Sequence, residues 1–472
     1  MKKIALLLIS SFLLLTACNG AKENSDELSS DASVSSQESS SASSSSVSEE
    51  MEEMEDITVA AKMQGKENDY KETYTYNNSY FLTPSNEFNK DIAMFAFGAA
   101  TANTDRKSMY NFYTALGFSN IFISNSYLGD PTETSIAYTF ATRSNVLIAS
   151  IRGFNYQAEW SNNFLLGKEG DHEGFTLVTN KFIKDLDKYI NKYSLFNHRI
   201  LITGYSRAGA VANMAADMLF KREADQKLVP DENFYIYTYE APMGLANKTA
   251  YGNVFNLVNS GDPIPYFAPA KYGFTRCGND IDIYASNIDE LAAHYHKGIT
   301  LPAFTPQTKD EGDSDLDPDY ANEAEYAQYV MKLLLREEVD VYPMDTREHF
   351  VDNGQPIFQY FLKMVFSLKS ATLTAIGAAL ATKSTSDLLS LIVDGQNLHD
   401  FLKPYLTLDG YQFDDDELLE NCNIVSNMIT AGPLSAVLLL YMLGQDNLNR
   451  AIYMHYPEIN YILLKNYLSQ AE

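Results

Sequence analysis

The feature that most constrains this fold is a short apolar strand that runs directly into a glycine-rich turn and a helix. The strand is predicted over 199–203, the turn reads Gly204-Tyr-Ser-Arg-Ala-Gly209, and an Ala- and Met-rich helix follows. A serine at the centre of such a turn needs small residues two positions away on either side, which Gly204 and Ala208 provide. The pattern predicts a nucleophile elbow with Ser206 at its tip.

Strands and helices alternate through the middle of the chain. Short apolar strands are predicted over 146–151, 234–239 and 254–258, and apolar residues recur at helical spacing over 175–193. This alternation predicts an α/β fold with a mostly parallel sheet and helices on both faces. After about Pro302 no strand pattern is found and the sequence is helical, which predicts a C-terminal insertion or cap.

The N-terminus predicts a lipid anchor. Lys2 and Lys3 precede an apolar run over 4–15, and Leu15-Thr-Ala-Cys18 follows where a cleavage site belongs. The apolar run is too short to span a bilayer comfortably. Leu-Thr-Ala-Cys resembles the lipobox of bacterial lipoproteins, which implies lipidation of Cys18 and a location on the extracellular face of the membrane. The alternative is an ordinary secretory signal in which Cys18 is incidental.

Composition divides the chain further and excludes some partners. The net charge of −27 argues against nucleic acid, and an acidic body has no general attraction to anionic lipids, so membrane attachment needs the anchor. We expect a monomer. The predicted parts are a signal peptide (1–17), a Ser-rich disordered tether (18–58), an α/β-hydrolase core (59–302), a helical insertion or cap (303–450) and a closing helix (451–472).

Six segments between Asn145 and Ile283 resemble, in order, the class 3 or fungal-lipase-like family. They are Ile151-Arg-Gly153 with Trp160 beyond it, His172-Glu-Gly-Phe175, Ile202 to Ser206, Ala210 to Asn213, Tyr237 to Gly244, and Asn256 to Pro265. The resemblance implies an α/β-hydrolase fold. It also implies a serine esterase or lipase that cleaves carboxylic, chiefly lipid, esters through a Ser-His-Asp triad and an acyl-enzyme.

The chain departs from the family pattern at several positions around the expected site. Phe154 replaces a Thr or Ser, so only its backbone N–H can serve the oxyanion hole, together with the N–H of Arg207. Glu240 replaces a Gly, and Ala208 replaces the second Gly of the elbow. Because a fold does not guarantee an activity, the alternative function is a non-catalytic surface-binding lipoprotein on a hydrolase scaffold.

Asp262 is the predicted triad acid. It matches the family segment that carries the acid, and it follows a predicted strand at the carboxyl end of the sheet, where open α/β folds place their sites. Pro263 and Pro265 are expected to hold the chain extended beyond it and to turn it away. Glu240, also at a strand end, is the second candidate acid.

The base must be a histidine that follows the acid in the chain, since α/β hydrolases have the order Ser, Asp, His. His349 and His399 lie in helical sequence with ordinary surface neighbours. His455 is favoured because it precedes an aromatic-rich closing helix, much as the family ends its domain. His294 is the alternative, because it is closer to Asp262 in sequence.

No cofactor and no metal are expected. The acidic residues over 313–319 do not match a calcium loop, and His294-x-His296 has no third zinc ligand nearby. Cys277 and Cys422 could form one disulfide but not a disulfide framework.

Overall fold

The computed structural model describes most of the chain after residue 54. The described residues are 55–63, 71–102, 105–127, 135–153, 162–267, 270–295, 299–309, 319–335, 345–383, 387, 390–391, 393–431 and 445–470. The predicted signal peptide, Cys18, most of the predicted tether, Phe154, Trp160 and His296 therefore lie outside the described residues.

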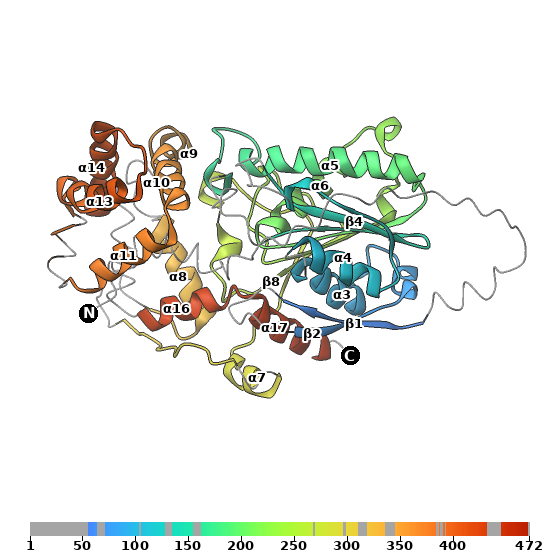
Figure 1. Cartoon of the computed structure of the whole chain (residues 1–472). Helices are drawn as coiled ribbons and strands as arrows, with labels where there is room; N and C mark the ends of the chain where they lie inside the picture. Colours follow the sequence, from blue (N-terminus) through green and yellow to red (C-terminus); the bar gives the residue numbers. More distant parts are fainter. Residues whose placement is uncertain are drawn as a thin grey trace, which may run out of the picture.

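A seven-stranded sheet forms the centre of the larger part of the molecule (Figure 1), and its strands follow one another in chain order. The first two pairings are antiparallel, and every pairing from β5 to β9 is parallel. The mostly parallel sheet predicted from the sequence is confirmed. The strands are β3 (Ser119–Ile123), β4 (Tyr138–Arg143), β5 (Val146–Ile151), β6 (Arg199–Tyr205), β7 (Phe234–Tyr239), β8 (Val254–Val258) and β9 (Asn279–Asp282).

Helices cover both faces of this sheet because its strands are apolar on both sides. Along β6, Ile200 and Ile202 join the core under α5 (Glu173–Tyr193) and α6 (Arg207–Phe220). Leu201 and Tyr205 point the other way and join a second core. Successive strand residues face opposite sides, so one strand serves both cores. The second core packs α3 (Lys90–Thr101), α4 (Arg106–Ala115), α17 (Pro457–Gln470) and the hairpin of β1 (Ile57–Lys62) and β2 (Lys71–Tyr76).

Beyond the sheet, the described residues from 319 to 453 are almost entirely helical, which confirms the predicted helical C-terminal region. Figure 1 shows α9 to α14 grouped to one side of the sheet. Helices α10, α11, α13 and α14 share an apolar core of their own. The helices are α8 (Glu323–Leu335), α9 (Arg347–His349) with a π turn (Phe350–Gly354), α10 (Gln355–Ser367), α11 (Ser370–Ala381), α13 (Gly395–Asp409), α14 (Asp415–Ala431) and α16 (Gln445–Tyr453). We call α8 to α16 the helical region and the remainder, including α17, the sheet domain.

The two parts meet through polar contacts and through an apolar cluster of Leu166, Tyr272, Phe274 and Phe350. The guanidinium of Arg347 donates to the backbone carbonyls of Leu166, Gly167, Glu169 and Gly170 at 2.6–3.2 Å, and we call this group the Arg347 clamp. Gln355 accepts a bond from the N–H of Leu166 at 3.0 Å. A second link joins α16 to the sheet domain, where Arg450 bonds Asp289 of α7 (Ile288–Tyr295).

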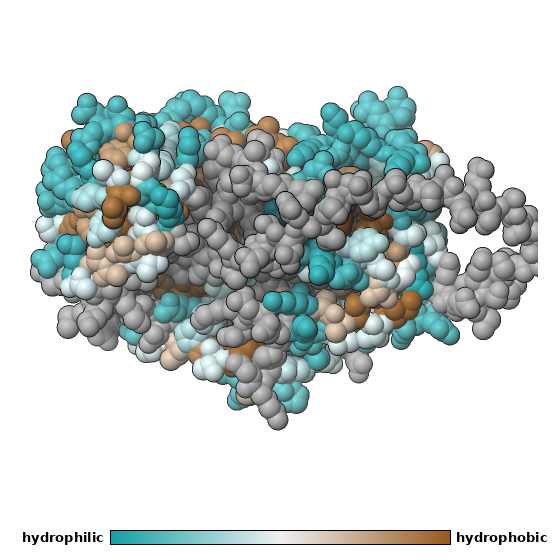
Figure 2. Space-filling view, in the orientation of Figure 1, coloured by the Kyte–Doolittle hydropathy of each residue, from teal (hydrophilic) through white to brown (hydrophobic). Residues whose placement is uncertain are grey.

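The described surface is mostly hydrophilic along the outer edges of α5, α9 and α14, with scattered hydrophobic patches (Figure 2). In the part of the chain that the structure describes, no helix is long and apolar enough to cross a membrane. Cys277 and Cys422 are both buried and free. They belong to different apolar cores, Cys277 under α6 and Cys422 in the helical region.

Candidate active site

Ser206 lies at the turn between β6 and α6, as the sequence pattern predicts. Its backbone has φ 57° and ψ −129°, a strained conformation for a residue other than glycine. A Cβ added at Gly204 would lie 2.4 Å from the carbonyl oxygen of Ala208 and 2.9 Å from its Cβ. The turn therefore requires glycine at the first of these positions and leaves little room at the second. The strain and the close packing raise the Ser206 side chain above the end of the sheet.

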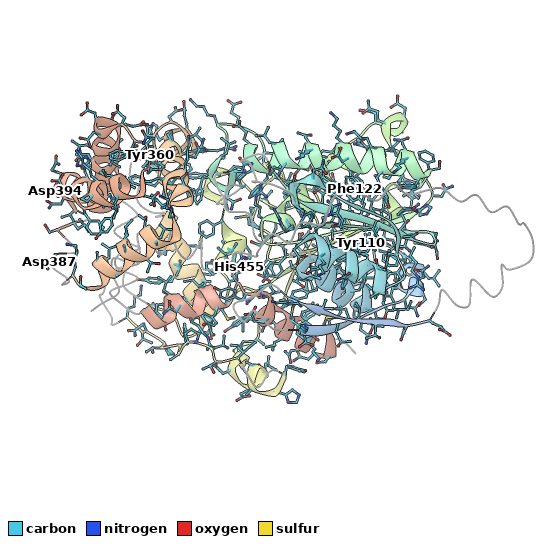
Figure 3. The ribbon with its side chains drawn as sticks, in the orientation of Figure 1. Tyr110, Phe122, Tyr360, Asp387, Asp394 and His455 are labelled. Carbon is cyan, nitrogen blue, oxygen red and sulfur yellow. The ribbon has the colours of Figure 1, made fainter. Side chains whose placement is uncertain are left out.

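His455 joins Ser206 to Asp262. Its Nε2 lies 2.9 Å from Ser206 Oγ, and its Nδ1 lies 2.5 Å from Asp262 Oδ2. The histidine lies in the turn between α16 and α17, and Figure 3 labels it between the sheet domain and the helical region. The structure thus brings together three predicted residues that are 56 and 193 positions apart in sequence.

Three polar side chains hold the turn that carries His455. The Tyr205 hydroxyl donates to the His455 carbonyl at 2.9 Å. Asn259 and Asn460 both donate to the Met454 carbonyl, at 2.9 and 2.8 Å. The sequence analysis missed all three residues. The available signal was Asn460, a polar residue among the mostly apolar buried residues of the closing helix.

Asp262 is fully buried at the carboxyl end of β8. Its Oδ1 accepts a bond from the N–H of Ile264 at 2.9 Å, so both carboxylate oxygens have donors. The expectation that the prolines hold this segment extended is wrong. Pro263 has φ −73° and ψ −19° and precedes a 3₁₀ helix (Ile264–Tyr266). The fixed φ of proline suits a first helical turn, and this bend brings the Ile264 N–H to Asp262.

Glu240, the second candidate acid, lies at the end of β7 and does not bond His455. Both of its carboxyl oxygens lie 3.1 Å from the backbone nitrogen of Asn259, and its side chain lies close to Asp262. Burial, followed by the neighbouring Asp262 charge, raises the pKa of Glu240 well above its usual range. Glu240 is therefore placed behind the acid, with no contact to the base.

The described half of the expected oxyanion hole is the N-terminus of α6. Arg207 is the first helical residue, and its N–H points out of that end of the helix, where the dipole favours a negative charge. Phe154, the other expected donor, lies outside the described residues. Its neighbour Gly153 packs against the elbow so closely that a Cβ there would lie 2.1 Å from the Tyr205 carbonyl oxygen.

The alternative base is placed elsewhere. His294 is exposed in the last turn of α7, and its ring lies 4.7 Å from that of Tyr295. Asp262 Oδ2, the oxygen that a triad base would bond, is taken by His455. His172 is buried at the start of α5, where its Nδ1 accepts the N–H of Phe175.

His172 is kept neutral by its surroundings, because burial lowers its pKa to about 3. His399 corrects one expectation. Instead of having ordinary surface neighbours, it is buried between Asp400, 2.8 Å from its Nδ1, and Asp415, 3.1 Å from its Nε2.

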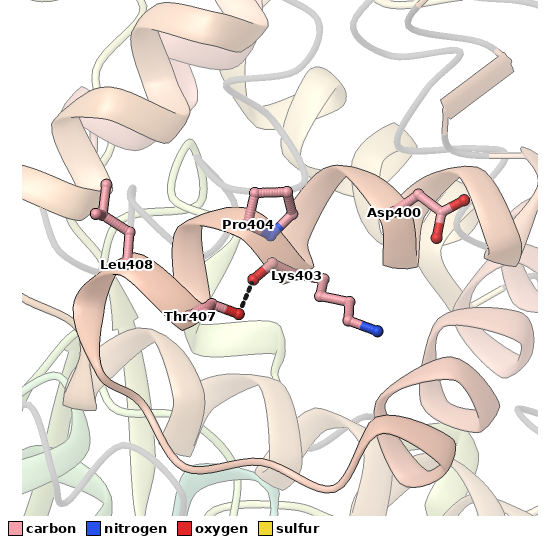
Figure 4. Close-up of a pocket in the computed structure, with 5 residues that line it drawn as sticks. All are labelled: Asp400, Lys403, Pro404, Thr407 and Leu408. Carbon is pink, nitrogen blue, oxygen red and sulfur yellow. Dashed lines mark hydrogen bonds between the residues drawn. The ribbon is translucent and has the colours of Figure 1, made fainter.

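A pocket of about 700 Å³ on α13 does not include this site (Figure 4). It is lined by Asp400, Lys403, Pro404, Thr407 and Leu408, all on one helix of the helical region. Among the described residues, no group of three His, Cys, Asp or Glu side chains is placed to hold a metal ion.

Comparison with known proteins decides the enzyme class. Residues 148–272 match the lipase (class 3) family. This class 3 segment is about a quarter of the 472-residue chain. It contains Ser206 and Asp262 and ends before His455. The match shows a class 3 lipase segment within the chain, and the protein is a carboxylic ester hydrolase of the lipase type. Its fold is an α/β-hydrolase with a helical C-terminal region.

Solved structures of fungal lipases are similar to part of this chain. A fungal lipase bound to an inhibitor is 17% identical, with 41% of this chain and 79% of that chain covered and a TM-score of 0.33. Lipase II from Rhizopus niveus is 18% identical, with coverage of 36% and 67% and a TM-score of 0.28. The triacylglyceride lipase of Rhizomucor miehei is 20% identical, with coverage of 33% and 64% and a TM-score of 0.26. No curated protein sequence matches the chain.

Proposed function

We propose that this protein is a serine lipase or esterase that hydrolyses lipid esters with Ser206 as nucleophile, His455 as base and Asp262 as acid. One observation carries the proposal. The Ser206 hydroxyl, both nitrogens of His455 and the Asp262 carboxylate form an unbroken hydrogen-bonded row. Ser206 is 6% exposed and the Asp262 side chain is fully buried, so the row is shielded from most of the solvent.

The proposed reaction follows the logic of a Ser-His-Asp triad. His455 Nε2 takes the Ser206 proton as Oγ attacks the ester carbonyl, and Asp262 stabilises the imidazolium. The oxyanion forms at the N-terminus of α6, where the Arg207 N–H donates to it, with Phe154 as the proposed second donor. His455 then protonates the departing alcohol. A water molecule, deprotonated by His455, attacks the acyl-enzyme and releases the acid, which restores Ser206.

The helical region is proposed to act as a cap that controls access of the substrate. It lies in sequence between Asp262 and His455, and it attaches to residues 166–170 through the Arg347 clamp. Caps of this kind exclude water from a site and complete it on closure. A cap that excludes water from the site would favour an apolar substrate such as a lipid ester.

Labelling with a fluorophosphonate probe tests the proposed function. Wild-type protein should be labelled at Ser206 and should hydrolyse p-nitrophenyl esters. Ser206→Ala should lose the label and lower turnover by roughly 10³- to 10⁶-fold. Ser194→Ala is a matched control, because Ser194 has a similar backbone (φ 55°) at the exposed end of α5. A folded wild-type protein that neither labels nor hydrolyses esters would instead favour the surface-binding alternative.

We further propose that the mature protein is a monomer anchored by lipid at Cys18 on the extracellular face of the bacterial membrane. The lipobox-like Leu15-Thr-Ala-Cys18 supports this, and the acidic body offers no other attraction to a membrane. Cys18→Ala should move the protein from the membrane fraction into the medium. Cys18→Ala protein that stays in the membrane fraction would contradict the anchor.

A further inference from the structure

Two buried carboxyl groups lie side by side behind His455, and the proposed triad uses only one of them. Glu240 and Asp262 are both fully buried, and the Asp262 charge lies close enough to Glu240 to raise the pKa of its carboxyl. They follow neighbouring parallel strands, β7 and β8. Two neighbouring ionised carboxylates would repel each other strongly where water is excluded, so such a pair retains one proton.

The hydrogen-bond partners indicate which residue keeps that proton. Asp262 accepts one bond from the N–H of Ile264 and another from Nδ1 of His455. The two oxygens of Glu240 share one N–H, that of Asn259. Donors stabilise the charged form of a carboxyl group, so the negative charge belongs on Asp262. Glu240 is then the neutral acid, and its O–H is the group that can donate between the two carboxyls.

The other charged or titratable groups around Glu240 do not change this assignment. Tyr205 on β6 and Tyr266 after β8 face it, and burial raises the pKa of both, that of Tyr266 to about 12, so both stay neutral. Arg276 is the neighbouring cation. It directs its guanidinium to the carbonyls of Ala241 and Pro265 and to the Asp280 carboxylate.

The backbone at Glu240 shows that the side chain is held in place against strain. Its φ is 48°, in the left-handed region that glycine adopts without cost. Strained residues persist where the surrounding structure determines their conformation, and they cluster at functional sites. At Glu240 this conformation accompanies a side chain that contacts both Asn259 and Asp262.

We propose that Glu240 is a positioning residue that stays protonated and donates its O–H to Asp262, thereby holding the carboxylate that orients His455. This inference rests on the proposed function. The hydrogen-bonded row then has four members: Ser206, His455, Asp262 and Glu240. Glu240 acts through Asp262 and does not touch the reacting atoms.

The pH profile of kcat/KM for a short p-nitrophenyl ester tests this role. Glu240→Gln preserves the size and neutrality of the side chain and an N–H donor toward Asp262. We therefore expect kcat to stay within about threefold of wild type. The acid limb of the profile, where activity falls as the pH is lowered, should not move. Glu240→Gly relaxes the backbone but removes the donor, so kcat should fall about 10- to 100-fold with little change in KM. In difference infrared spectra, the band of a protonated carboxyl group should be present in wild type and absent from Glu240→Gln.

The acid limb reports the ionisation of His455 in the free enzyme. If Glu240 were ionised, Glu240→Gln would remove a negative charge that stabilises the imidazolium of His455, and the acid limb would move to lower pH by roughly one unit or more. That shift would overturn the proposal, and so would full activity in Glu240→Gly. If Glu240→Gly does not fold, the Glu240→Gln profile decides alone. Fluorophosphonate labelling of wild type is scored first, because its absence counts against the proposed function rather than against Glu240.

Discussion

The sheet domain and the helical region differ in how they are held together. The sheet domain has an apolar core on each face of its sheet, and β6 contributes residues to both. The helical region has a smaller core of its own among α10, α11, α13 and α14. The two parts are joined by polar bonds such as the Arg347 clamp and by an apolar cluster in which Leu166 and Phe274 pack with Phe350. A part with its own core can vary without disturbing the sheet.

The candidate triad belongs wholly to the sheet domain, although the acid and the base are 193 positions apart in sequence. Ser206 and Asp262 follow strands of the sheet, and His455 follows the last helix of the helical region. Met454 and Tyr456, which flank His455, are nevertheless buried in the core beneath the sheet. The chain therefore leaves the sheet domain after α7, forms the helical region and returns with the histidine. The helical region is therefore an insertion between the acid and the base, and it contributes none of the three triad residues.

The assignment of the whole triad to the sheet domain fails if His455 is not the base. Substituting the two candidate histidines tests this assignment, and it has the largest expected effect. His455→Ala should lower turnover of p-nitrophenyl esters by on the order of 10³- to 10⁶-fold, because it removes the proton acceptor of Ser206. His294→Ala should remain within about threefold of wild type, since His294 is exposed on α7. Thermal unfolding of both variants controls for misfolding. Loss of activity only in His294→Ala would mean that His455 has no catalytic role.

Much of the sheet domain could be predicted because its signals are local. The strand before Ser206, the small residues of the elbow and the helix after it are consecutive, and β6 extends only two residues past the predicted strand. Asp262 follows the end of its strand by four residues. Each of these predictions needed the sequence of one element and the rule that parallel strands end at the same edge of a sheet.

What could not be predicted depends on contacts between distant residues. The choice between His455 and His294 needed the fold, because sequence proximity favoured one and position before the last helix favoured the other. The burial of His399 depends on Asp415, which lies on the next helix. The 3₁₀ turn after Asp262 was missed because proline suits both an extended chain and a first helical turn. The Tyr205 hydroxyl, which holds the Met454–His455 turn, donates to the His455 carbonyl and accepts a bond from the Asn460 amide. Both bonds join residues about 250 positions apart in sequence.

The Arg347 clamp between the two regions offers the smallest expected effect and the most specific test of the cap. Arg347→Lys keeps the charge but loses the planar fork that reaches four carbonyls, so the attachment should weaken by about 1–2 kcal/mol. Proteolysis should then cut the helical region faster. The ratio of long-chain to short-chain ester turnover should also change, while turnover of p-nitrophenyl acetate stays within about threefold of wild type.

Lys168→Gln is the matched control for this variant. Lys168 pairs with Asp352 between the same two segments, but both side chains are about half exposed. Solvent and salt screen such a pair, so its loss should leave proteolysis and chain-length preference as in wild type. If Arg347→Lys behaves like Lys168→Gln in both measurements, the clamp does not hold the helical region over the site, and the cap proposal loses its structural basis. If only Arg347→Lys shifts the chain-length ratio, access to Ser206 depends on the helical region even though the triad does not.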